Sequence, residues 1–457
     1  MIINSFSKDF EKKLKASDKR VGYFNGINLL ALLRRPLKFR YMSKFDREFL
    51  STNHSKRSLS DVVLVMRSIL FSALSLRFLL NTSSTKHLFL GFSRRSPRSD
   101  GKLLDRFHDP IIDALDPKQC LMIERPFKLT HFNNRATSCR VVDYDIFVYL
   151  SLLLSYVILP IVLLRNRSAI CEFVSNVNDE FGYTILSSKG VALTYCTFKV
   201  ESLFSKFFLK LIKPNNLVVT SRWLHYPMLY QARKLGIKSF EVQHGCVMPE
   251  NFFYSEFNEY QFDVDSMLVF SEYWKESNWN TKNVFAIGVS QEKVIVRAER
   301  KKSSVLVISQ PETSTKLDKT LYDIATANSE LMFEIKLHPQ DMANYAKRYS
   351  HVLSLNNVSV VGMADTNTEN LTTKYQLILG FTSSVLFEAY HLGASVGIIC
   401  DKDNDASVYE KYYGVAVDCF HFLKVGEKIS SIHFEHKDSG MNFYDELNKE
   451  LITEILK

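Results

Sequence analysis

The segment LILGFTSSVLFEAYHLGASVGIIC, residues 377–400, decides the fold class of this chain. It opens with the short apolar run Leu377–Leu379, which predicts a buried strand, and then enters a helical pattern over Val385–Leu392. Gly393 ends that helix, and Val396–Cys400 is a second apolar strand. A strand, a helix and another strand in this order predict two parallel neighbours in one sheet.

The same alternation of strands and helices extends upstream. The sequence predicts strands at Val305–Ser309, Leu331–Leu337 and Val358–Gly362, and a helix at Leu317–Asn328. An earlier series of strands is predicted at His87–Phe92, Cys120–Ile123, Leu217–Thr220 and Lys238–Val242. Two more short strands, Ser266–Phe270 and Val284–Ile287, are assigned to the later unit. We therefore expect an α/β chain in which two Rossmann-like domains face a cleft.

These patterns divide the chain into four regions. We expect a basic helical N-terminal region over 1–85, a first Rossmann-like domain over 86–262, a second over 263–440, and a C-terminal helix over 441–457. In such sheets, ligands bind outside the carboxyl ends of the strands, so the residues that follow each strand are the first candidates for function.

Composition excludes several classes of protein. Of 457 residues, 46% are hydrophobic and 23% charged, which is globular composition and argues against a disordered chain. The seven cysteines are scattered without a CxxC pair, which argues against a disulfide scaffold or a zinc ribbon and favours a reducing compartment. The N-terminal stretch MIINSFSKDFEKKLK lacks the apolar core of a signal peptide. We therefore expect a cytoplasmic protein.

Positive charge is concentrated at the start of the chain. The first 100 residues hold 20 Lys and Arg against 7 Asp and Glu, and the other 357 hold 38 against 42. The basic residues alternate with the apolar stretches Ile27–Leu33 and Val62–Leu80, a mixture that suits the surface of an anionic membrane. The alternative is a solvated basic layer packed on the main body. Nucleic acid is not expected as a partner, because no zinc-finger spacing or RNP motif is present.

One uncharged segment, Ile146–Leu164, is nineteen residues long and just long enough to span a bilayer. It contains Tyr149, Ser151 and Pro160, and a crossing there would place the two halves of one α/β domain on opposite sides of the membrane. We expect a buried or membrane-apposed helix, and a true span remains the alternative.

Two histidines follow predicted strands. His244 comes directly after Lys238–Val242, and Gly245 behind it lets the backbone turn, so His244 can face the cleft as a general base. The alternative is a structural histidine bonded to backbone. Lys336, His338 and Pro339 end another strand, where they can bind a diphosphate or a base edge.

Hydroxyl groups open the helix in residues 385–392. Thr382, Ser383 and Ser384 can cap it, and its free N–H groups form an anion site, although plain capping explains the same residues. Glu388 lies one turn on and can accept hydrogen bonds from a ribose diol, and Gln310 occupies the usual position of a phosphate loop. After the first strand of the first domain, Arg94, Arg95 and Asp100 can hold an anionic acceptor or form a polar loop.

In chain order, the strand ends carry Gln243-His-Gly245, Ser271-Glu-Tyr-Trp274, Ile287-Gly288, Gln310-Pro311, Lys336-Leu-His-Pro339, Thr382-Ser-Ser384 with Glu388, and Asp401. This series resembles the GT-B glycosyltransferase fold. It is similar, more closely, to bacterial surface-polymer transferases: the CDP-glycerol glycerophosphotransferases of teichoic acid synthesis and the sialyl- and Kdo-type transferases of capsule and lipopolysaccharide. The resemblance does not include residues 1–85, and over 86–240 it is limited to the general alternation of strands and helices.

The resemblance implies an inverting glycosyltransferase. It would move a sugar from a CMP-sugar or other nucleotide-activated donor to a surface polysaccharide or lipid-linked glycan, at the inner face of the cytoplasmic membrane, with no cofactor and no metal. Asp143-Tyr-Asp145 matches the DxD of metal-dependent transferases, a pattern common by chance. The alternatives are a CDP-glycerol-type polyol-phosphate transferase, a nucleotide-sugar 2-epimerase, and a non-enzymatic membrane-associated polysaccharide-binding protein.

Overall fold

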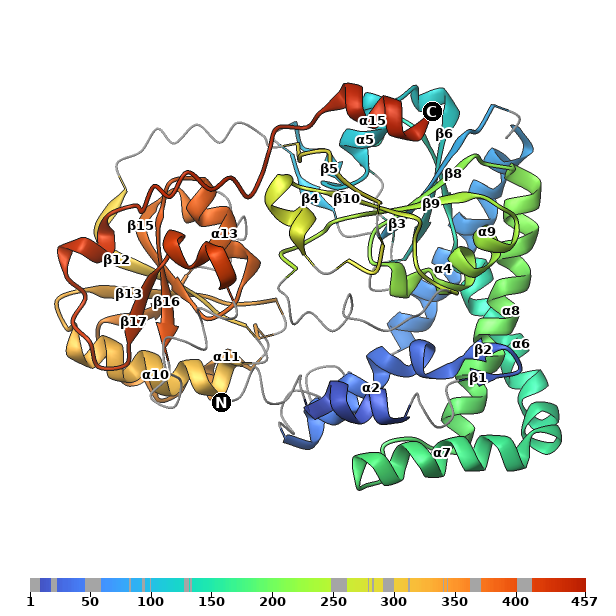
Figure 1. Cartoon of the computed structure of the whole chain (residues 1–457), viewed down its shortest axis with the longest axis horizontal. Helices are drawn as coiled ribbons and strands as arrows, with labels where there is room; N and C mark the ends of the chain where they lie inside the picture. The colour runs from blue at the N-terminus through green and yellow to red at the C-terminus, as the bar shows by residue number, and fades with distance from the viewer. Residues whose placement is uncertain are drawn as a thin grey trace.

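The computed structural model describes residues 9–17, 23–45, 59–81, 84–92, 95–98, 100–126, 131, 134–247, 261–277, 279–281, 283–290, 300–310, 313–339, 341–342, 344–361, 371–400 and 413–457. Figure 1 shows two α/β domains side by side, with the N-terminal helices beneath the first domain.

The first domain is built on a sheet of seven parallel strands in the order β11-β10-β9-β8-β3-β6-β7. The strands are β3 (His87–Phe92), β6 (Cys120–Arg125), β7 (Arg140–Asp143), β8 (Asn216–Val219), β9 (Lys238–Val242), β10 (Ser266–Val269) and β11 (Asn283–Ala286). A short antiparallel hairpin of β4 (Ser96–Pro97) and β5 (Leu103–Leu104) follows β3. Buried residues alternate between the two faces of this sheet because strand side chains have a period of two.

Helices cover both faces of the first sheet. They are α5 (Asp109–Ala114), α6 (Asp145–Arg165), α8 (Ser188–Ile212), α9 (Tyr226–Lys234) and the C-terminal α15 (Lys449–Leu456), and α7 (Arg167–Phe181) packs on α6 and α8. Leu88 and Leu217 belong to the same core as residues of α8 and α9. Phe89 and Val218, one position along each strand, belong to a separate core with residues of α5 and α15.

The second domain contains a sheet of six parallel strands in the order β14-β13-β12-β15-β16-β17. Its elements are β12 (Lys301–Ile308), α10 (Ser314–Ala327), β13 (Met332–Lys336), α11 (Tyr345–Arg348), β14 (Val358–Val360), β15 (Tyr375–Gly380), α13 (Ser384–His391), β16 (Ser395–Cys400) and β17 (His421–Lys424). Val305 and Val307 pack in one core with residues of α10, and Leu306 and Ile308 pack in the other with residues of α13.

Both sheets are wound in the same way. In each, the chain builds three strands outward in one direction, returns beside its first strand and then builds outward in the other. The direction reverses between β3 and β8 in the first sheet and between β12 and β15 in the second. Ligands of doubly wound sheets bind at the carboxyl ends of the strands at such a reversal. The expected fold of two Rossmann-like domains is confirmed.

The boundary between the domains differs from the one that the sequence predicts. β10 pairs with β9, and β11 pairs with β10, so both strands belong to the first sheet. The second sheet begins at Lys301, and assigning residues 266–287 to the second domain was wrong. Short apolar strands look alike in sequence, and only their pairing shows to which sheet they belong.

The N-terminal region contains β1 (Tyr23–Phe24), β2 (Ile27–Asn28), α2 (Leu29–Phe45) and α4 (Leu59–Ser75). α2 packs against α8, and Ile27, Leu30 and Leu33 are buried. This first apolar stretch is therefore part of the protein core, so it does not face a membrane. α4 packs on α6 and β7 and leaves Val63 and Met66 exposed.

Two described helical segments are long and apolar enough to cross a membrane, judged by length and composition alone. Val62–Leu79 has a mean hydropathy of 1.9 and Asp145–Arg165 of 2.5, and only 22% and 17% of their residues are buried. The expectation that Ile146–Leu164 forms a helix is confirmed, but the helix is not buried.

The last segment of the chain returns from the second domain to the first, as the red trace in Figure 1 shows. It passes over Gly288, where a Cβ atom would lie 2.1 Å from the Glu446 carbonyl oxygen, so no other residue fits there. The Asp445 backbone N–H donates to the Phe270 carbonyl, and the Asp445 carbonyl accepts from the Val289 N–H, each at 2.9 Å. This crossing segment ties the two domains together.

Trp274 is the centre of this joint. It is 1% exposed, and its Nε1 donates to the Phe443 carbonyl at 2.8 Å. Its ring lies 5.6 Å from that of Phe387 on α13, and Phe387 lies 4.9 Å from Phe443. The first domain, the second domain and the crossing segment therefore meet in one aromatic cluster.

We predict that Trp274→Ala loosens the domain joint. Removing a buried tryptophan costs about 3–5 kcal/mol, and the loss falls on contacts between domains. Thermal unfolding should change from one transition to two, because the domains would then melt separately. Trp274→Phe keeps a ring and is the matched control, for which we expect one transition. A single unchanged transition in Trp274→Ala would contradict this role.

Candidate functional site

The carboxyl edge of the second sheet brings two predicted site residues together. Gln310 follows β12 and Thr382 follows β15, the two strands that flank the reversal. The Gln310 Oε1 atom accepts from the Thr382 backbone N–H at 3.1 Å and from its hydroxyl at 3.2 Å. Gln310 thus connects the two loops at the position where doubly wound sheets bind ligands.

The loop that carries His338 lies at the same edge. The His338 backbone N–H donates to the Ser309 hydroxyl at 2.7 Å, and Ser309 precedes Gln310. Buried Asp341 accepts from Ser309 and Tyr349 at 3.2 Å each and forms an ion pair with Arg348. Lys336 and His338 are half-buried and Pro339 is exposed. The structure therefore places Gln310, Thr382 and the His338 loop at one edge of the second sheet.

Helix α13 begins at this edge with the expected cap. The Ser383 hydroxyl accepts from the Val385 N–H at 3.3 Å, and Thr382, Ser383 and Ser384 are all half-buried. One cationic residue was missed by the sequence analysis. Lys316, in the first turn of α10, places its Nζ 5.0 Å from the centre of the Phe381 ring, next to Thr382. The edge therefore offers helix N–H groups, hydroxyls and positive charge, a combination that suits an anion.

His244 follows β9 at the carboxyl edge of the first sheet and is half-buried. Its Nε2 lies 3.2 Å from the Ser221 hydroxyl, at the end of the neighbouring strand. The rings of Trp223 and Phe107 lie 5.3 and 6.3 Å away. Two aromatic rings and a hydroxyl thus fix the orientation of the imidazole.

Ser221 adopts a conformation that L-residues rarely take. Its φ is 61° and its ψ 66°, the left-handed region that costs a non-glycine residue about 1–2 kcal/mol. The next residue holds it there. The Arg222 backbone N–H donates to Glu241 at 3.0 Å, and its guanidinium pairs with Glu241 and with Asp263 at 3.1 Å. Strain that is maintained by buried ion pairs is typical of a functional position.

A buried chain of hydrogen bonds supports the residue before Ser221. The Thr220 hydroxyl lies 2.8 Å from His108 Nε2, and His108 Nδ1 lies 3.0 Å from Asp105. All three residues are buried, so this chain acts as framework and cannot touch a substrate. The sequence predicts a strand that ends at Thr220, and the polar run Thr220-Ser-Arg222 at its end is the sequence signal for these contacts.

The segment that crosses between the domains contacts the loop that follows His244. Cys246 Sγ lies 3.8 Å from Tyr444 Oη, which belongs to the crossing segment. Burial raises the pKa of the Cys246 thiol well above its usual value, and the carboxylate of Glu388 on α13 raises it further. Burial and then Cys246 and Glu388 likewise raise the pKa of Tyr444. Helix α13 contacts the same tyrosine, since the ring of His391 lies 5.4 Å from that of Tyr444.

The structure places the three residues predicted to bind the acceptor differently. Arg94 lies outside the described residues. The Arg95 side chain is fully buried and pairs with Glu124 at 2.9 Å and with Asp109 at 3.0 Å. Its guanidinium belongs to the framework of the first domain, which contradicts its prediction as an acceptor ligand. Asp100 is exposed at the tip of the β4–β5 hairpin, where it accepts from Lys102 and pairs with Arg98.

One cluster in the described part of the chain has the composition of a metal site. Atoms of Glu124, His131 and Asp143 lie within 4.8 Å of one another. An arginine already occupies the space between the two carboxylates: Arg135 Nη2 lies 2.6 Å from Glu124 and 2.8 Å from Asp143. These carboxylates are neutralised by a guanidinium, so the donor set does not fit a metal ion.

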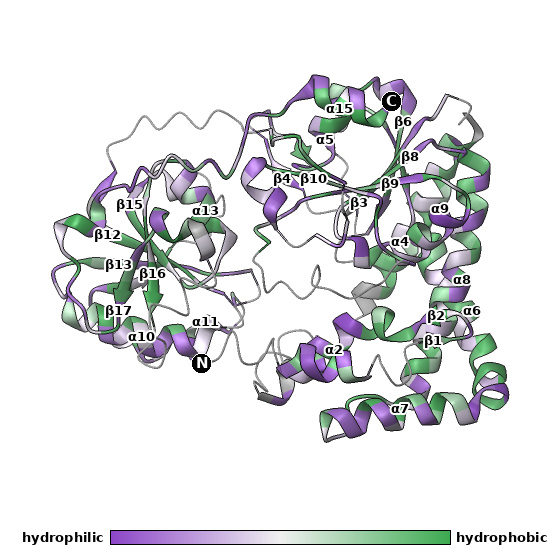
Figure 2. Ribbon diagram, viewed as in Figure 1, coloured by the Kyte–Doolittle hydropathy of each residue, from purple (hydrophilic) through white to green (hydrophobic). Residues whose placement is uncertain are grey.

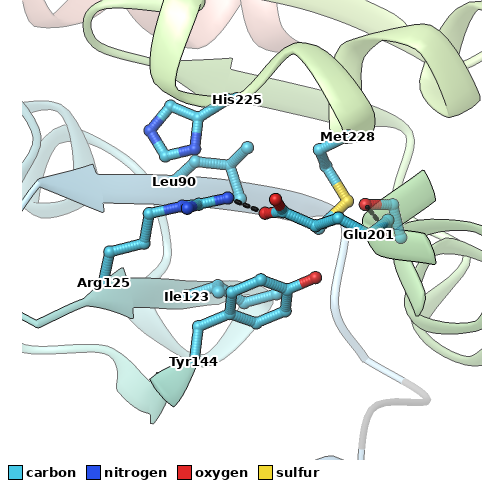
Figure 3. A pocket seen from close by; sticks show the side chains of 8 residues that line it. Leu90, Ile123, Arg125, Tyr144, Glu201, His225 and Met228 are labelled. Carbon is cyan, nitrogen blue, oxygen red and sulfur yellow. Dashed lines mark hydrogen bonds and ion pairs between the residues drawn. The ribbon is translucent and has the colours of Figure 1, made fainter. Parts of the chain in front are cut away.

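Figure 3 shows a small pocket inside the first domain, lined by Leu90, Ile123, Arg125, Tyr144, Glu201, Ser205, His225 and Met228. Arg125 from β6 points to Glu201 from α8, with which it forms an ion pair. Burial and then the positive charge of Arg125 lower the pKa of His225 well below its usual value. The pocket lies between the sheet and α8 and is too small for a sugar.

No protein-family profile and no curated protein matches this chain. Several solved structures resemble it. UDP-GlcNAc 2-epimerase from Neisseria meningitidis, bound to UDP-GlcNAc, is 14% identical, and the match covers 81% of this chain and 99% of that one at a TM-score of 0.45. The glycosyltransferase VinC with dTDP is 12% identical and covers 81% and 94% at 0.40. MurG from Acinetobacter baumannii is 12% identical and covers 81% and 93% at 0.37. These similarities are weak, and the strand order of the two sheets establishes the fold.

We predict that two substitutions at Ser221 differ in their effect on stability. Ser221→Gly relieves the left-handed strain, whereas Ser221→Ala keeps it, so the glycine variant should be more stable by about 1 kcal/mol. Urea unfolding of both variants measures the difference. Equal stability, or a less stable glycine variant, would show that Ser221 is not strained.

Proposed function

We propose that this protein is a glycosyltransferase that uses a nucleotide-activated sugar. The observation that carries the proposal is the contact, through Tyr444, between the loop after His244 and helix α13. His244 is half-buried at the carboxyl edge of the first sheet, Cys246 Sγ lies 3.8 Å from Tyr444 Oη, and the Tyr444 ring lies 5.4 Å from that of His391 on α13. The hydroxyl-capped N-terminus of α13 is suited to bind an anion. The sequence resemblance to surface-polymer transferases supports the same assignment.

The second domain would bind the nucleotide. Thr382, Ser383, Ser384 and the N–H groups of α13 are suited to hold the phosphate, and Gln310 keeps the loop of Thr382 in place. His338 and Lys336 would supply positive charge and hydrogen bonds to the diphosphate or base, together with Lys316. Glu388 would accept hydrogen bonds from the ribose. These groups favour departure of the nucleotide because they stabilise the negative charge that develops on its phosphate.

The first domain would bind the acceptor and supply the base. His244 would take the proton from the acceptor hydroxyl while that oxygen attacks the anomeric carbon and the bond to the phosphate breaks. This single displacement inverts the configuration at the carbon. The contacts of His244 with Ser221, Trp223 and Phe107 keep the ring in one orientation, which base catalysis requires. The acceptor would be a surface polysaccharide or a lipid-linked glycan.

The cheapest test is a thermal-shift screen of the full chain against CMP-, CDP-, UDP-, GDP- and dTDP-sugars. A ligand at a hundred times its Kd stabilises the folded state by about 2.7 kcal/mol, so one class of nucleotide should raise the melting temperature clearly. The sugar that binds is then supplied with and without glycan acceptors. Conversion of the free nucleotide sugar without acceptor would overturn the transferase assignment in favour of an epimerase. No shift with any nucleotide would overturn an enzymatic function.

We predict that His244→Ala keeps nucleotide binding and lowers turnover by about 10²–10⁴-fold, because general base catalysis typically contributes that much. Release of nucleotide in the presence of acceptor measures turnover. His351→Ala, on the surface of the second domain, is the control and should retain full activity. Turnover of His244→Ala near that of the control would rule out His244 as the base.

We predict that Ser383→Ala combined with His338→Ala weakens nucleotide binding while the fold is retained. Calorimetric titration should show at least a tenfold higher Kd, because charge-assisted hydrogen bonds are among the stronger contacts to a phosphate. Ser187→Ala is the matched control, since Ser187 caps α8 in the same way at a distance from this edge. An unchanged Kd in the double variant would contradict the donor site.

A further inference from the structure

The outer surface of the first domain carries an unusual concentration of apolar side chains. Among the described residues, 17 of the 20 exposed large hydrophobic side chains lie on α4, α6 and α8. Examples are Met66 on α4, Val157 on α6 and Leu203 on α8, at 64%, 64% and 67% exposed. α6 packs between the other two helices, so these residues form one continuous surface, which we call the three-helix face. In Figure 2 the hydrophobic colour runs along α4 and α6.

The polarity of α4 and α6 is reversed relative to helices of a water-soluble domain. Ser68, Ser72 and Ser75 of α4 are buried, and so are Ser151 and Ser155 of α6. Ser72 accepts from the Ile146 N–H at 3.2 Å and donates to the Asp143 carbonyl at 2.5 Å. A soluble helix turns its apolar residues inward. Small polar residues inside and large apolar residues outside are typical of helices that pack together in contact with lipid.

Helix α8 adds positive charge to this surface. The exposed residues of its second half are Lys199, Leu203, Lys206, Phe207, Lys210 and Leu211. Their spacing of three and four residues places them on one side of the helix. The one acidic residue of α8, Glu201, is buried and paired with Arg125. Lysines can lay their aliphatic stems on an apolar surface and direct their ammonium groups to phosphates.

This charge pattern decides between two occupants of the three-helix face. A second copy of the chain in a symmetric dimer would place the same lysines of both copies at one interface, where they repel. An anionic phospholipid bilayer instead offers acyl chains to the leucines and phosphates to the lysines, in the manner of an interfacial helix. We propose that the three-helix face docks the protein onto an anionic phospholipid membrane.

The helices lie on the membrane and do not cross it. α6 starts at buried Asp145, which bonds Ser68 and His131, and its Ser151 and Ser155 side is buried within the domain. α8 continues into β8 after a short turn. A helix with one side packed on a Rossmann-like domain cannot be surrounded by lipid, so α6 would rest with its outer side in the interface.

The proposal does not rest on the proposed function, since lipid binding is measured without nucleotide or acceptor. If the acceptor is lipid-linked, this docking would bring it near the carboxyl edge of the first sheet, because α6 begins immediately after β7.

The test is sedimentation of the full chain with vesicles. Phosphatidylcholine vesicles with half phosphatidylglycerol should pellet the protein, and pure phosphatidylcholine should pellet much less. Leu153→Glu combined with Val157→Glu should lower the partition coefficient at least tenfold, because two apolar contacts are lost. Lys199→Gln, Lys206→Gln and Lys210→Gln together should abolish the preference for anionic lipid, at about fivefold per lysine. All these side chains are exposed, so the fold should persist, as circular dichroism can verify.

Ile432→Glu is the matched control, because Ile432 is 57% exposed on the second domain, away from the three-helix face. It should bind vesicles like the wild type. Equal binding by the Leu153/Val157 variant, or no binding of the wild type to anionic vesicles, would overturn the proposal. Dimers in analytical ultracentrifugation that disappear with Leu153→Glu and Val157→Glu would assign the face to a second copy and also overturn it. If these variants still show a thermal shift with nucleotide, their loss of membrane binding does not contradict the proposed function.

Discussion

The aromatic joint around Trp274 connects the two domains, and the relative position of their candidate site residues depends on it. The tryptophan comes from the first domain, Phe387 from the second, and Phe443 from the segment that crosses between them. Gly288 allows that segment to lie directly on the first domain. Phe387 and His391 lie on the same helix, α13, and His391 packs on Tyr444, which contacts Cys246 in the loop after His244, so the contact that joins the domains also positions this helix relative to that loop.

In each domain, buried polar contacts hold the backbone that carries the candidate site residues. In the first domain, Arg222 and its two carboxylates keep Ser221 in a strained conformation, and Ser221 in turn contacts His244. In the second, Asp341 gathers Ser309, Arg348 and Tyr349 beneath the His338 loop. A buried charge must be paired, so these networks resist rearrangement. Rigid loops of this kind are suited to an enzyme that must position a base and a leaving group independently.

The proposed reaction and the proposed membrane contact fit one geometry. The nucleotide would enter at the second domain and the acceptor at the first, whose outer helices carry apolar side chains and lysines without exposed acidic groups on α8. The sequence predicted a membrane contact in the basic N-terminal region, at the apolar stretches Ile27–Leu33 and Val62–Leu80. The structure buries Ile27 and Leu33, but it exposes apolar residues of α4, most of which lies in the second stretch, together with those of α6 and one side of α8. Basic charge in a sequence does not show whether neighbouring apolar residues face lipid or the core, since only packing decides this.

The alternation of short apolar runs with helices predicted two doubly wound domains without any structure, because parallel strands buried on both faces are near-continuous apolar runs in the sequence. Local signals also sufficed for the cap at Ser383, where a hydroxyl precedes a helix. Tertiary structure alone decided that β10 and β11 join the first sheet, that Arg95 is a buried framework residue, and that Ser221 touches His244. Each of these depends on contacts between residues far apart in the chain, and the pattern of residues along a single strand or loop does not contain them.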